Sequence, residues 1–500
     1  MQQVGYAFLK TQLALSAFSV PKPAVVAPVN RIVTSIGGGT LQVPVHVAPK
    51  TEDPLEHILF ALKHEGTNLQ VLAEALPQVA VRQLVERFRE SPNSIYLRKA
   101  GYLFEALTGQ EIEDLPLLTA PYSDLFDADR YVTGPKQRNG KWRINFNGLG
   151  SLAYCPSVER TTKIEAAIQS DVLGRTKAFV DSIGPVNADR ALGWAYLSET
   201  ESSFAIEREA PSRNKAEAFV ALLHQAHEPV LLTEDYLCNL QSAAITNPLD
   251  RAAAFRHQQN WLRRGGTRGA TSVTYVPPAP ELLHELMPAF LELANTAPKQ
   301  IDPIVAAAIS SFGFVYLHPF MDGNGRLSRF LFHHALCQSG RLDKGLLLPV
   351  SMAMKREESS YLETLDTFSK PARKLWDVRW IDEDQFDFVF CGRDTIYRYW
   401  DATACVDFGF RMAEQALDVH LRQETEYLAR FDRIREAVNT EYDVRNNDLH
   451  VLIASALQAN GVVSNNRRKQ HALSVQPEVF DRIEELARRE LDNAEEKPER

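Results

Sequence analysis

The spacing of hydrophobic and polar positions divides the 500-residue chain into three regions. In residues 1–155, helical periodicity over 54–112 is flanked by strand-like stretches, which predicts a domain of mixed helix and strand. From about 160 to 375, the pattern of apolar residues is mostly helical, which predicts a mainly helical region. Residues 376–500 are also predicted to be helical, because their aromatic residues keep helical spacing to about position 435.

Composition is that of an ordinary globular protein. Hydrophobic residues make up 45% and charged residues 24%, and the net charge is −9, so the chain has no global attraction to nucleic acid. Its five cysteines form no Cys-x-x-Cys pair, which argues against a disulfide scaffold or a cysteine zinc site and favours the cytoplasm. No apolar run approaches the roughly 18 residues of a membrane span, so no membrane contact is expected. The N-terminus is interpreted as mature protein.

One twelve-residue block, 318–329, combines the candidate catalytic residues. It reads His-Pro-Phe-Met-Asp-Gly-Asn-Gly-Arg-Leu-Ser-Arg. Apolar segments of helical period precede it at 304–317 and follow it at 327–338. The block is therefore predicted to be a glycine-containing turn that opens the second of two helices.

The residue types of this turn suit phosphate groups. Gly323 and Gly325 let the backbone approach a ligand and adopt positive φ. Together with Asn324, their amides can point into one concavity at the positive end of the following helix. Arg326 and Arg329 are three residues apart and share one helix face. Two guanidinium groups on that face suit two phosphates of a polyphosphate.

Two further residues of the block suggest a metal ion and a base. Asp322 would repel a neighbouring polyphosphate unless a cation lay between them, and Mg²⁺ is commonly held by one or two carboxylates plus substrate phosphates. His318 can take a proton near neutral pH, which suits a general base for an attacking hydroxyl. Each feature alone is commonly a cap, a turn or a surface charge. Their combination in one block favours a functional site.

The block resembles the core motif of Fic-domain proteins. His318-Pro-Phe-x-Asp322-Gly-Asn-Gly-Arg326-x-x-Arg329 matches every fixed position of that motif. The similarity extends more loosely over about 190–375. It implies an all-α core that transfers AMP from ATP to a hydroxyl group of a target protein and releases pyrophosphate.

The resemblance also assigns roles within the block. His318 would deprotonate a Ser, Thr or Tyr hydroxyl of the target, and Asp322 would hold Mg²⁺. Asn324, Arg326 and the turn amides would bind the α and β phosphates of ATP. Arg329 would bind the γ phosphate.

Residues of about 270–278 resemble the flap of Fic proteins, since Tyr-Val-Pro-Pro-Ala-Pro occurs at 275–280. The alternation before these prolines is strand-like, as a flap hairpin requires. Val273, Thr274 and Tyr275 would pair with an extended target segment and so fix its register.

A second segment, about 192–208, resembles the inhibitory helix of Fic proteins, Ser/Thr-x-x-x-Glu-Gly/Asn. Ser203 and Glu207 have the required separation. The implied mechanism is an ion pair from Glu207 to Arg329, which would occupy the arginine needed for the γ phosphate. Arg208 stands where the family has Gly or Asn, and arginine is disfavoured at a left-handed helix end. The helix is therefore expected to run on, or the inhibition to be looser.

Several alternatives stay open from the sequence. The scaffold could transfer UTP-, GTP- or CTP-derived groups, or remove AMP from a modified protein with Glu207 positioning a water. A DNA-binding regulator with a Fic sensor core is less favoured. It rests only on the basic cluster 467–469, in a small helix-turn-helix-like end of the chain. The resemblance is also compatible with a homodimer. The sequence does not identify the target protein or the role of residues 1–155.

Overall fold

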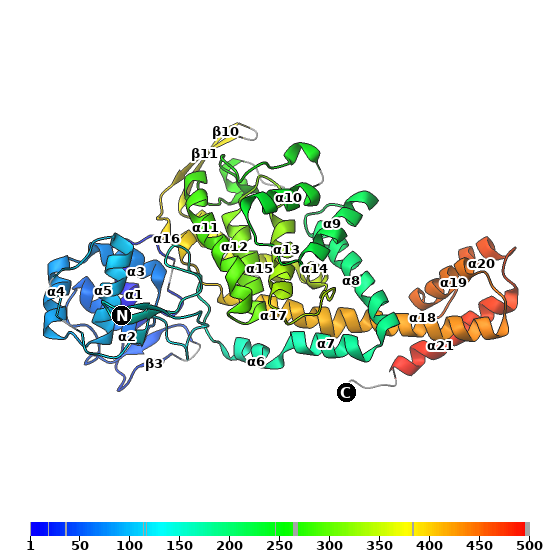
Figure 1. Ribbon diagram of the computed structural model, residues 1–500, viewed down its shortest axis with the longest axis horizontal. Coiled ribbons are helices and arrows are strands. Elements are labelled where there is room, and N and C mark those ends of the chain that lie inside the picture. Colours follow the sequence, from blue (N-terminus) through cyan, green and yellow to red (C-terminus); the bar gives the residue numbers. More distant parts are fainter. Residues whose placement is uncertain are drawn as a thin grey trace.

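The chain is arranged as three parts in a row: an N-terminal domain, a central helical core and a C-terminal helical bundle (Figure 1). The computed structural model describes residues 2–495 except 19, 36–37, 114, 117, 246, 264–268 and 383–384. The mainly α fold agrees with the sequence prediction. Within the described residues, no helix has the length and apolar character that crossing a membrane requires.

The N-terminal domain mixes helices with small sheets, as predicted. One sheet has the strand order β1-β2-β4-β3, in which β2 and β4 are parallel and the other neighbours antiparallel. A second sheet has the order β5-β7-β6. The bounds are β1 Gln3–Val4, α1 Gly5–Gln12, β2 Ala24–Val26, β3 Val33–Thr34, β4 Leu41–Val43, α2 Pro54–His64, α3 Leu69–Ala75, α4 Val81–Glu90, α5 Ile95–Thr108, β5 Ser123–Asp124, β6 Gln137–Asn139 and β7 Ile144–Phe146.

This domain is fixed to the core by buried polar contacts. Gln70 of α3 donates from Nε2 to the carbonyl oxygen of Tyr399 at 2.8 Å. Glu74, one turn later, accepts from the Thr395 hydroxyl at 2.8 Å. Thr395 and Tyr399 belong to and follow α16 (Thr395–Arg398). Because these groups are buried, their hydrogen bonds hold the two parts in one orientation.

The core is built around α12 (Pro303–Leu317), which is apolar around its circumference and buried along nearly all its length. Asp302 caps its start by accepting from the amides of Ile304 (2.9 Å) and Val305 (3.3 Å). The helices around it are α6 Thr162–Ser170, α7 Val172–Ser182, α8 Pro185–Ile206, α9 Arg213–Gln225, α10 Glu234–Ala244, α11 Pro280–Thr296, α13 Asn324–Gln338, α14 Val350–Arg356, α15 Glu358–Arg373 and α17 Thr403–Gln415.

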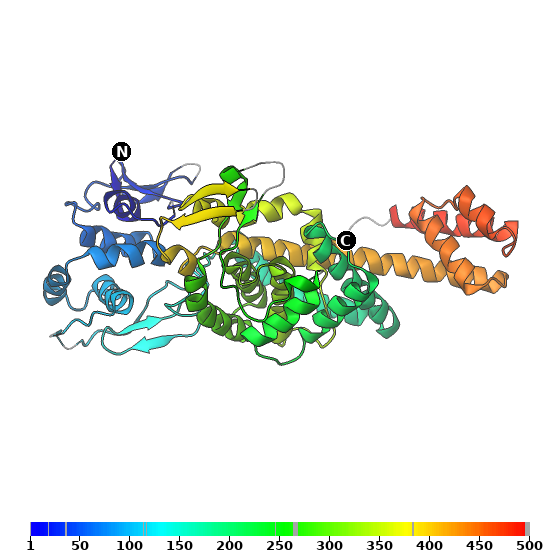
Figure 2. The same ribbon diagram turned by 90° about the horizontal axis from the view of Figure 1, so that it is seen from above.

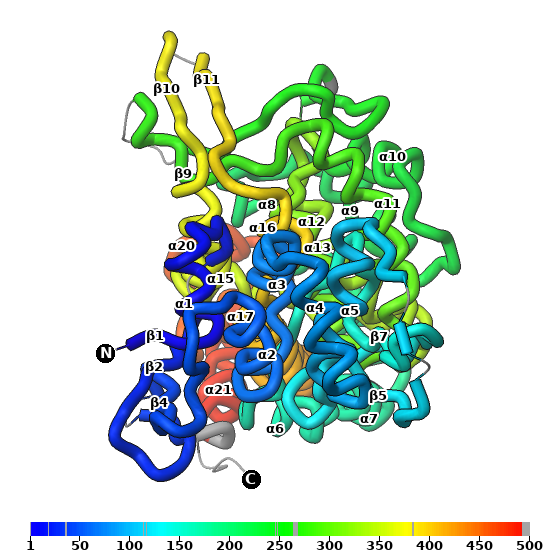
Figure 3. Tube along the Cα trace, turned by 90° about the vertical axis from the view of Figure 1, so that its left-hand side faces the viewer, coloured from blue at the N-terminus to red at the C-terminus, as the bar shows by residue number. Residues whose placement is uncertain are grey.

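The helical prediction for 376–390 is wrong. Residues 376–382 and 385–390 form two antiparallel strands, β10 (Trp376–Asp382) and β11 (Gln385–Phe390), which extend beside β9 (Val273–Tyr275) (Figure 3). Trp376, Val378 and Trp380 alternate along one face, the period of a strand rather than a helix. The later aromatics, Tyr397 to Phe410, are buried in and before α17, as predicted for a packed core.

The C-terminal bundle projects from the core on the long helix α18 (Arg422–Glu441), which continues α17 through a π-helical turn (Figure 2). It has its own apolar core, which includes Phe431, Leu452 and Ile483. In the predicted basic cluster 467–469, Arg468 pairs with Asp481 (3.0 Å) and Glu484 (2.6 Å), which offsets its charge. The remaining helices are α19 Asn446–Gln458, α20 Asn465–His471 and α21 Pro477–Glu495.

Candidate active site

The predicted turn between two helices is present. α12 ends at Leu317, and His318 follows in the left-handed conformation with φ 52°. Gly323 caps α13 with φ 88°, and a Cβ there would lie 3.1 Å from the Ile245 side chain. Glycine therefore meets both a backbone and a packing requirement at this position.

Upstream residues bind the backbone carbonyls of residues 318–322, through side chains and one backbone amide. Arg256 donates to the first two carbonyls, Asn260 to the next two and Gln241 to the last. The distances are 2.8 Å from Arg256 Nε to His318 O, 2.8 Å from Arg256 N to Pro319 O, 3.0 and 3.2 Å from Asn260 Nδ2 to Phe320 O and Met321 O, and 3.2 Å from Gln241 Nε2 to Asp322 O.

His318 is buried and neutral at physiological pH. Burial lowers the pKa of its imidazole to about 4. The charge of Arg256 also lowers this pKa, whereas the Val315 carbonyl and the Glu207 carboxylate raise it. Nδ1 lies 3.2 Å from the Val315 carbonyl oxygen. Since a carbonyl can only accept, Nδ1 carries the proton and the Nε2 lone pair is left to act as a base.

The Asn324 side chain shapes the turn. Its Oδ1 accepts from the Phe320 amide at 3.0 Å, and its Nδ2 donates to the Phe320 carbonyl at 2.7 Å. The group that Asn324 can present to a phosphate is therefore its backbone amide at the start of α13. Phosphate binding by Asn324 stays a prediction.

Asp322 is the candidate metal ligand. Its side chain is 42% exposed, and Oδ1 accepts from the Gly323 amide at 2.6 Å. The described residues contain no group of three or more His, Cys, Asp or Glu side chains arranged to hold a metal ion. A single carboxylate fits an ion whose other ligands are phosphates and water, as for Mg²⁺ with a nucleotide.

Two buried guanidinium groups form the centre of the site, and each meets a carboxylate. Arg326 and Arg329 are both 1% exposed. Arg329 donates from Nη2 to Glu207 at 2.9 Å and from Nε to the Ser203 hydroxyl at 2.8 Å. Arg326 donates from Nη1 to Glu209 at 2.7 Å.

Glu207 also lies against the turn itself. A Cβ added to Gly325 would fall 2.0 Å from Glu207 Oε1. The carboxylate therefore rests on the backbone at the N-terminus of α13, where the sequence predicts a phosphate. An anionic group of this chain stands in that concavity.

The expectation that the helix before the site runs on past Arg208 is wrong. α8 ends at Ile206, and Arg208 adopts the left-handed conformation with φ 61°. The Arg208 amide bonds to the Ala205 carbonyl and the Glu209 amide to the Phe204 carbonyl, both at 3.1 Å. This is a Schellman motif, and the helix-end geometry outweighs the steric preference of arginine. The motif presents Glu207 and Glu209 to the two arginines.

The sequence prediction brought together Ser203, Glu207 and Arg329, and the structure places them in contact. It missed Glu209 and Arg256. The Schellman motif at the end of α8 is the feature that could have identified Glu209, because the left-handed Arg208 turns the chain back toward α13. No local pattern marks Arg256, whose side chain joins segments 22 and 62 residues away in the sequence.

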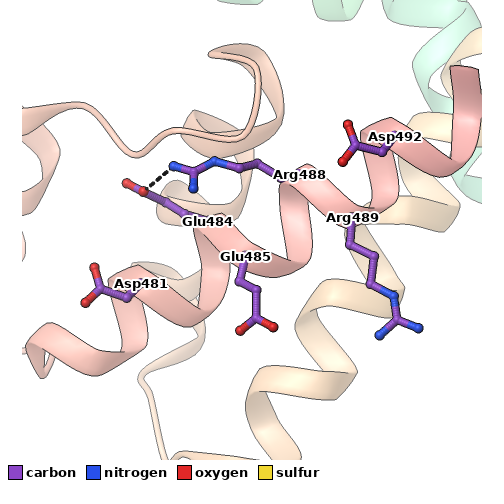
Figure 4. A pocket seen from close by; sticks show the side chains of 6 residues that line it. All are labelled: Asp481, Glu484, Glu485, Arg488, Arg489 and Asp492. Carbon is purple, nitrogen blue, oxygen red and sulfur yellow. Dashed lines mark hydrogen bonds and ion pairs between the residues drawn. The ribbon is translucent and has the colours of Figure 1, made fainter.

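A pocket on α21 lies in the C-terminal bundle, apart from this site (Figure 4). It is lined by acidic and basic side chains of one helix face. Glu484 accepts from Arg488 at 2.9 Å within it. The pocket has no place in the candidate chemistry.

Comparison with known proteins matches residues 231–336 to the Fic/DOC family. A 147-residue segment is 30% identical to a protein adenylyltransferase Fic of Nematostella vectensis, covering 29% of this chain and 31% of that protein. A 92-residue segment is 34% identical to a protein of the same name from Drosophila willistoni, covering 18% and 17%. The matched part spans about a third or less of these relatives.

Solved structures of Fic proteins also match. A Fic family protein from Desulfovibrio desulfuricans is 18% identical with a TM-score of 0.38, over 66% of this chain and 89% of that one. A Fic domain containing signaling protein from Bacteroides thetaiotaomicron is 15% identical with a TM-score of 0.36, over 49% and 96%.

Arg208→Gly is expected to stabilise the protein by about 1 kcal/mol, because glycine avoids the steric penalty of the left-handed conformation. The free energy of unfolding in urea measures this. Arg213→Gly, at the first position of α9, is the control and is expected to be neutral or destabilising. Equal effects of the two variants would contradict the strain at Arg208.

The low pKa of His318 predicts a loss of stability in acid. The unfolded chain binds a proton near pH 6.5 and the folded chain only near pH 4, so stability is full above pH 6.5 and falls as pH drops between these values. From pH 7 to pH 5 this group removes about 2 kcal/mol from the free energy of unfolding. His318→Gln should show a correspondingly shallower decline in urea unfolding. A parallel decline in both proteins would refute the burial effect.

Proposed function

The chain carries a Fic/DOC family domain, and from this premise we propose that it is a protein adenylyltransferase. It would transfer AMP from ATP to a Ser, Thr or Tyr hydroxyl of a target protein. The observation that carries the proposal is a neutral, buried His318 in the turn that precedes α13, together with two buried arginines on that helix. A base and a polyphosphate site are the two components that this reaction needs.

In the proposed reaction, His318 Nε2 accepts the proton of the target hydroxyl. The hydroxyl oxygen then bonds to the α phosphorus of ATP, and the bond from that phosphorus to the bridging oxygen of the β phosphate breaks. Pyrophosphate leaves with this oxygen and its electron pair. Arg326 and Arg329 would stabilise the phosphate charge, which is the main catalytic task in phosphoryl chemistry.

Asp322 is the residue that would hold Mg²⁺, since its carboxylate is half-exposed beside the phosphate turn. The ion, when bound, supplies positive charge to the phosphates. Arg326 Nη2 lies 3.3 Å from Asp322 Oδ1, so the carboxylate is oriented toward the same site.

The flap is the proposed docking site for the target. β9 pairs with β8 (Leu262–Arg263) in an antiparallel hairpin. Val273 and Tyr275 are buried and Thr274 is exposed, so alternate side chains anchor the strand. An extended target segment would pair with its backbone and present its hydroxyl to His318.

We also propose that the end of α8 inhibits the enzyme. Glu207 and Glu209 bind the arginines that ATP needs, and Glu207 lies against the backbone of Gly325. Two carboxylates in this position compete with the phosphates for the same donors. Inhibition therefore involves Arg326 as well as Arg329.

Incubation with Mg²⁺ and α-³²P-labelled ATP tests the transfer. We expect weak labelling of wild-type protein, strong labelling of Glu207→Gly, and none when His318→Ala is added to Glu207→Gly. Loss of the base should lower the rate by about 10²–10⁴-fold. Equal labelling of wild type and Glu207→Gly would remove the inhibition but keep the enzyme. Absence of label in every variant, with UTP, GTP and CTP also silent, would refute nucleotide transfer.

The role of Glu209 is tested by ATP binding in the Glu207→Gly background. Adding Glu209→Gln should tighten the Kd for ATP by about fivefold, since it removes a partly exposed ion pair worth about 1 kcal/mol from competition for Arg326. Titration calorimetry with Mg²⁺-ATP measures this. Glu201→Gln, an exposed residue of α8, is the matched control and should leave the Kd unchanged. The second contact is not inhibitory if Glu209→Gln behaves like Glu201→Gln.

A further inference from the structure

Arg256 lies between α10 and the flap, and its guanidinium joins segments that are distant in sequence. Nε donates to the His318 carbonyl at 2.8 Å, and Nη1 donates to the Gln258 carbonyl at 3.0 Å. Nη2 donates to the carbonyl of Pro278, at the end of the flap. In the described part of the chain, the acceptors of this side chain are all backbone carbonyls.

Because the guanidinium of Arg256 binds several backbone carbonyls, the shape of this side chain is part of its role. Arg256 is 4% exposed, and burial lowers the pKa of its guanidinium to about 10. A buried cation is costly, and an apolar side chain would fill the same space at less cost. What only arginine supplies here is a planar fork that reaches carbonyls on several sides at once.

The residues that follow Arg256 repeat the pattern. Gln259 donates to the Pro277 carbonyl at 3.0 Å, on the flap side. Asn260 donates to the carbonyls of Phe320 (3.0 Å) and Met321 (3.2 Å), on the side of the catalytic turn. The segment 256–260 thus connects the end of the flap to the turn that holds His318 by hydrogen bonds to both.

We propose that Arg256 is a positioning residue that holds the flap and the His318 turn in one fixed frame. The target strand on the flap and the base that takes its proton then keep a constant separation. Correct placement of reacting groups to within about an ångström matters strongly for rate. The role in catalysis rests on the proposed adenylyl transfer, whereas the coupling of the two segments does not.

Arg373 offers a matched control, because it bonds to the first part of the flap, whereas Arg256 bonds to its end. Its Nε donates to the Val273 carbonyl at 2.9 Å and its Nη2 to the Ala270 carbonyl at 3.2 Å. Its third contact is the Trp376 carbonyl of β10, at 2.9 Å. Arg373 therefore bonds to the flap and β10, and Arg256 to the flap and the catalytic turn.

Hydrogen–deuterium exchange of the full-length protein tests the coupling. In Arg256→Met, amides of the flap (270–278) and of the turn (314–323) should both exchange about tenfold faster. In Arg373→Met, the flap and the start of β10 should exchange faster, whereas the turn should not. Unchanged exchange of the turn in Arg256→Met, or an equal response of the turn in Arg373→Met, would overturn the proposal. If Arg256→Met does not fold, Arg256→Lys against Arg373→Lys makes the same comparison.

A second readout follows His318 itself by NMR titration of ¹⁵N-histidine-labelled protein, with His318→Gln to assign the signal. The charged groups that act on this imidazole are Arg256 and Glu207. Removing the positive charge in Arg256→Met should raise the pKa of His318, whereas Arg256→Lys and Arg373→Met should leave it unchanged. An unchanged pKa in Arg256→Met would overturn the placement of Arg256 against the turn that holds His318. Neither measurement needs AMP transfer, so failure of the proposed activity is distinguishable from failure of the coupling.

Discussion

Two buried positive charges, one turn apart on α13, determine how the centre of this protein can be arranged. Arg326 and Arg329 are almost fully removed from water, and like charges at this spacing repel unless anions lie between or beside them. Asp322 lies 3.3 Å from Arg326, and the α8-end carboxylates Glu207 and Glu209 supply the closer anions in this structure. In the proposed reaction the phosphates of ATP take their place. The same electrostatic requirement therefore links the folding of the α8 end to the occupancy of the proposed nucleotide site.

The position of these carboxylates depends on contacts deeper in α8. Glu199 is fully buried, accepts from the Ser351 amide at 2.7 Å and lies 2.7 Å from His333 Nε2 on α13. Arg190, nearer the start of α8, pairs with Asp432 of α18. The helix is thus anchored at two points before it reaches the site. The Schellman motif carries both carboxylates, so a movement of the last turn would displace Glu207 and Glu209 together.

The sequence identifies the site where its residues are local. His318 to Arg329 form one continuous block, and their spacing correctly predicts a turn at the start of a helix. Arg256 could not be identified from local sequence, because the carbonyl groups that it binds come together only in the folded chain. The prediction of helix for 376–390 is wrong because the aromatic residues that follow this segment have helical spacing. That spacing was extended to the strands before it. For Arg208, intrinsic preference pointed to a longer helix, but hydrogen bonds of the helix end and the two ion pairs overrode it.

The left-handed arginine at the end of α8 also has a consequence for how the protein can change over generations. Each of the six arginine codons becomes a glycine codon by a single nucleotide substitution. Such a substitution leaves the catalytic block and both carboxylates intact and alters only the stability of the turn that carries them. Residue 208 is therefore a point at which natural selection can adjust the proposed inhibition separately from the residues proposed to carry the chemistry.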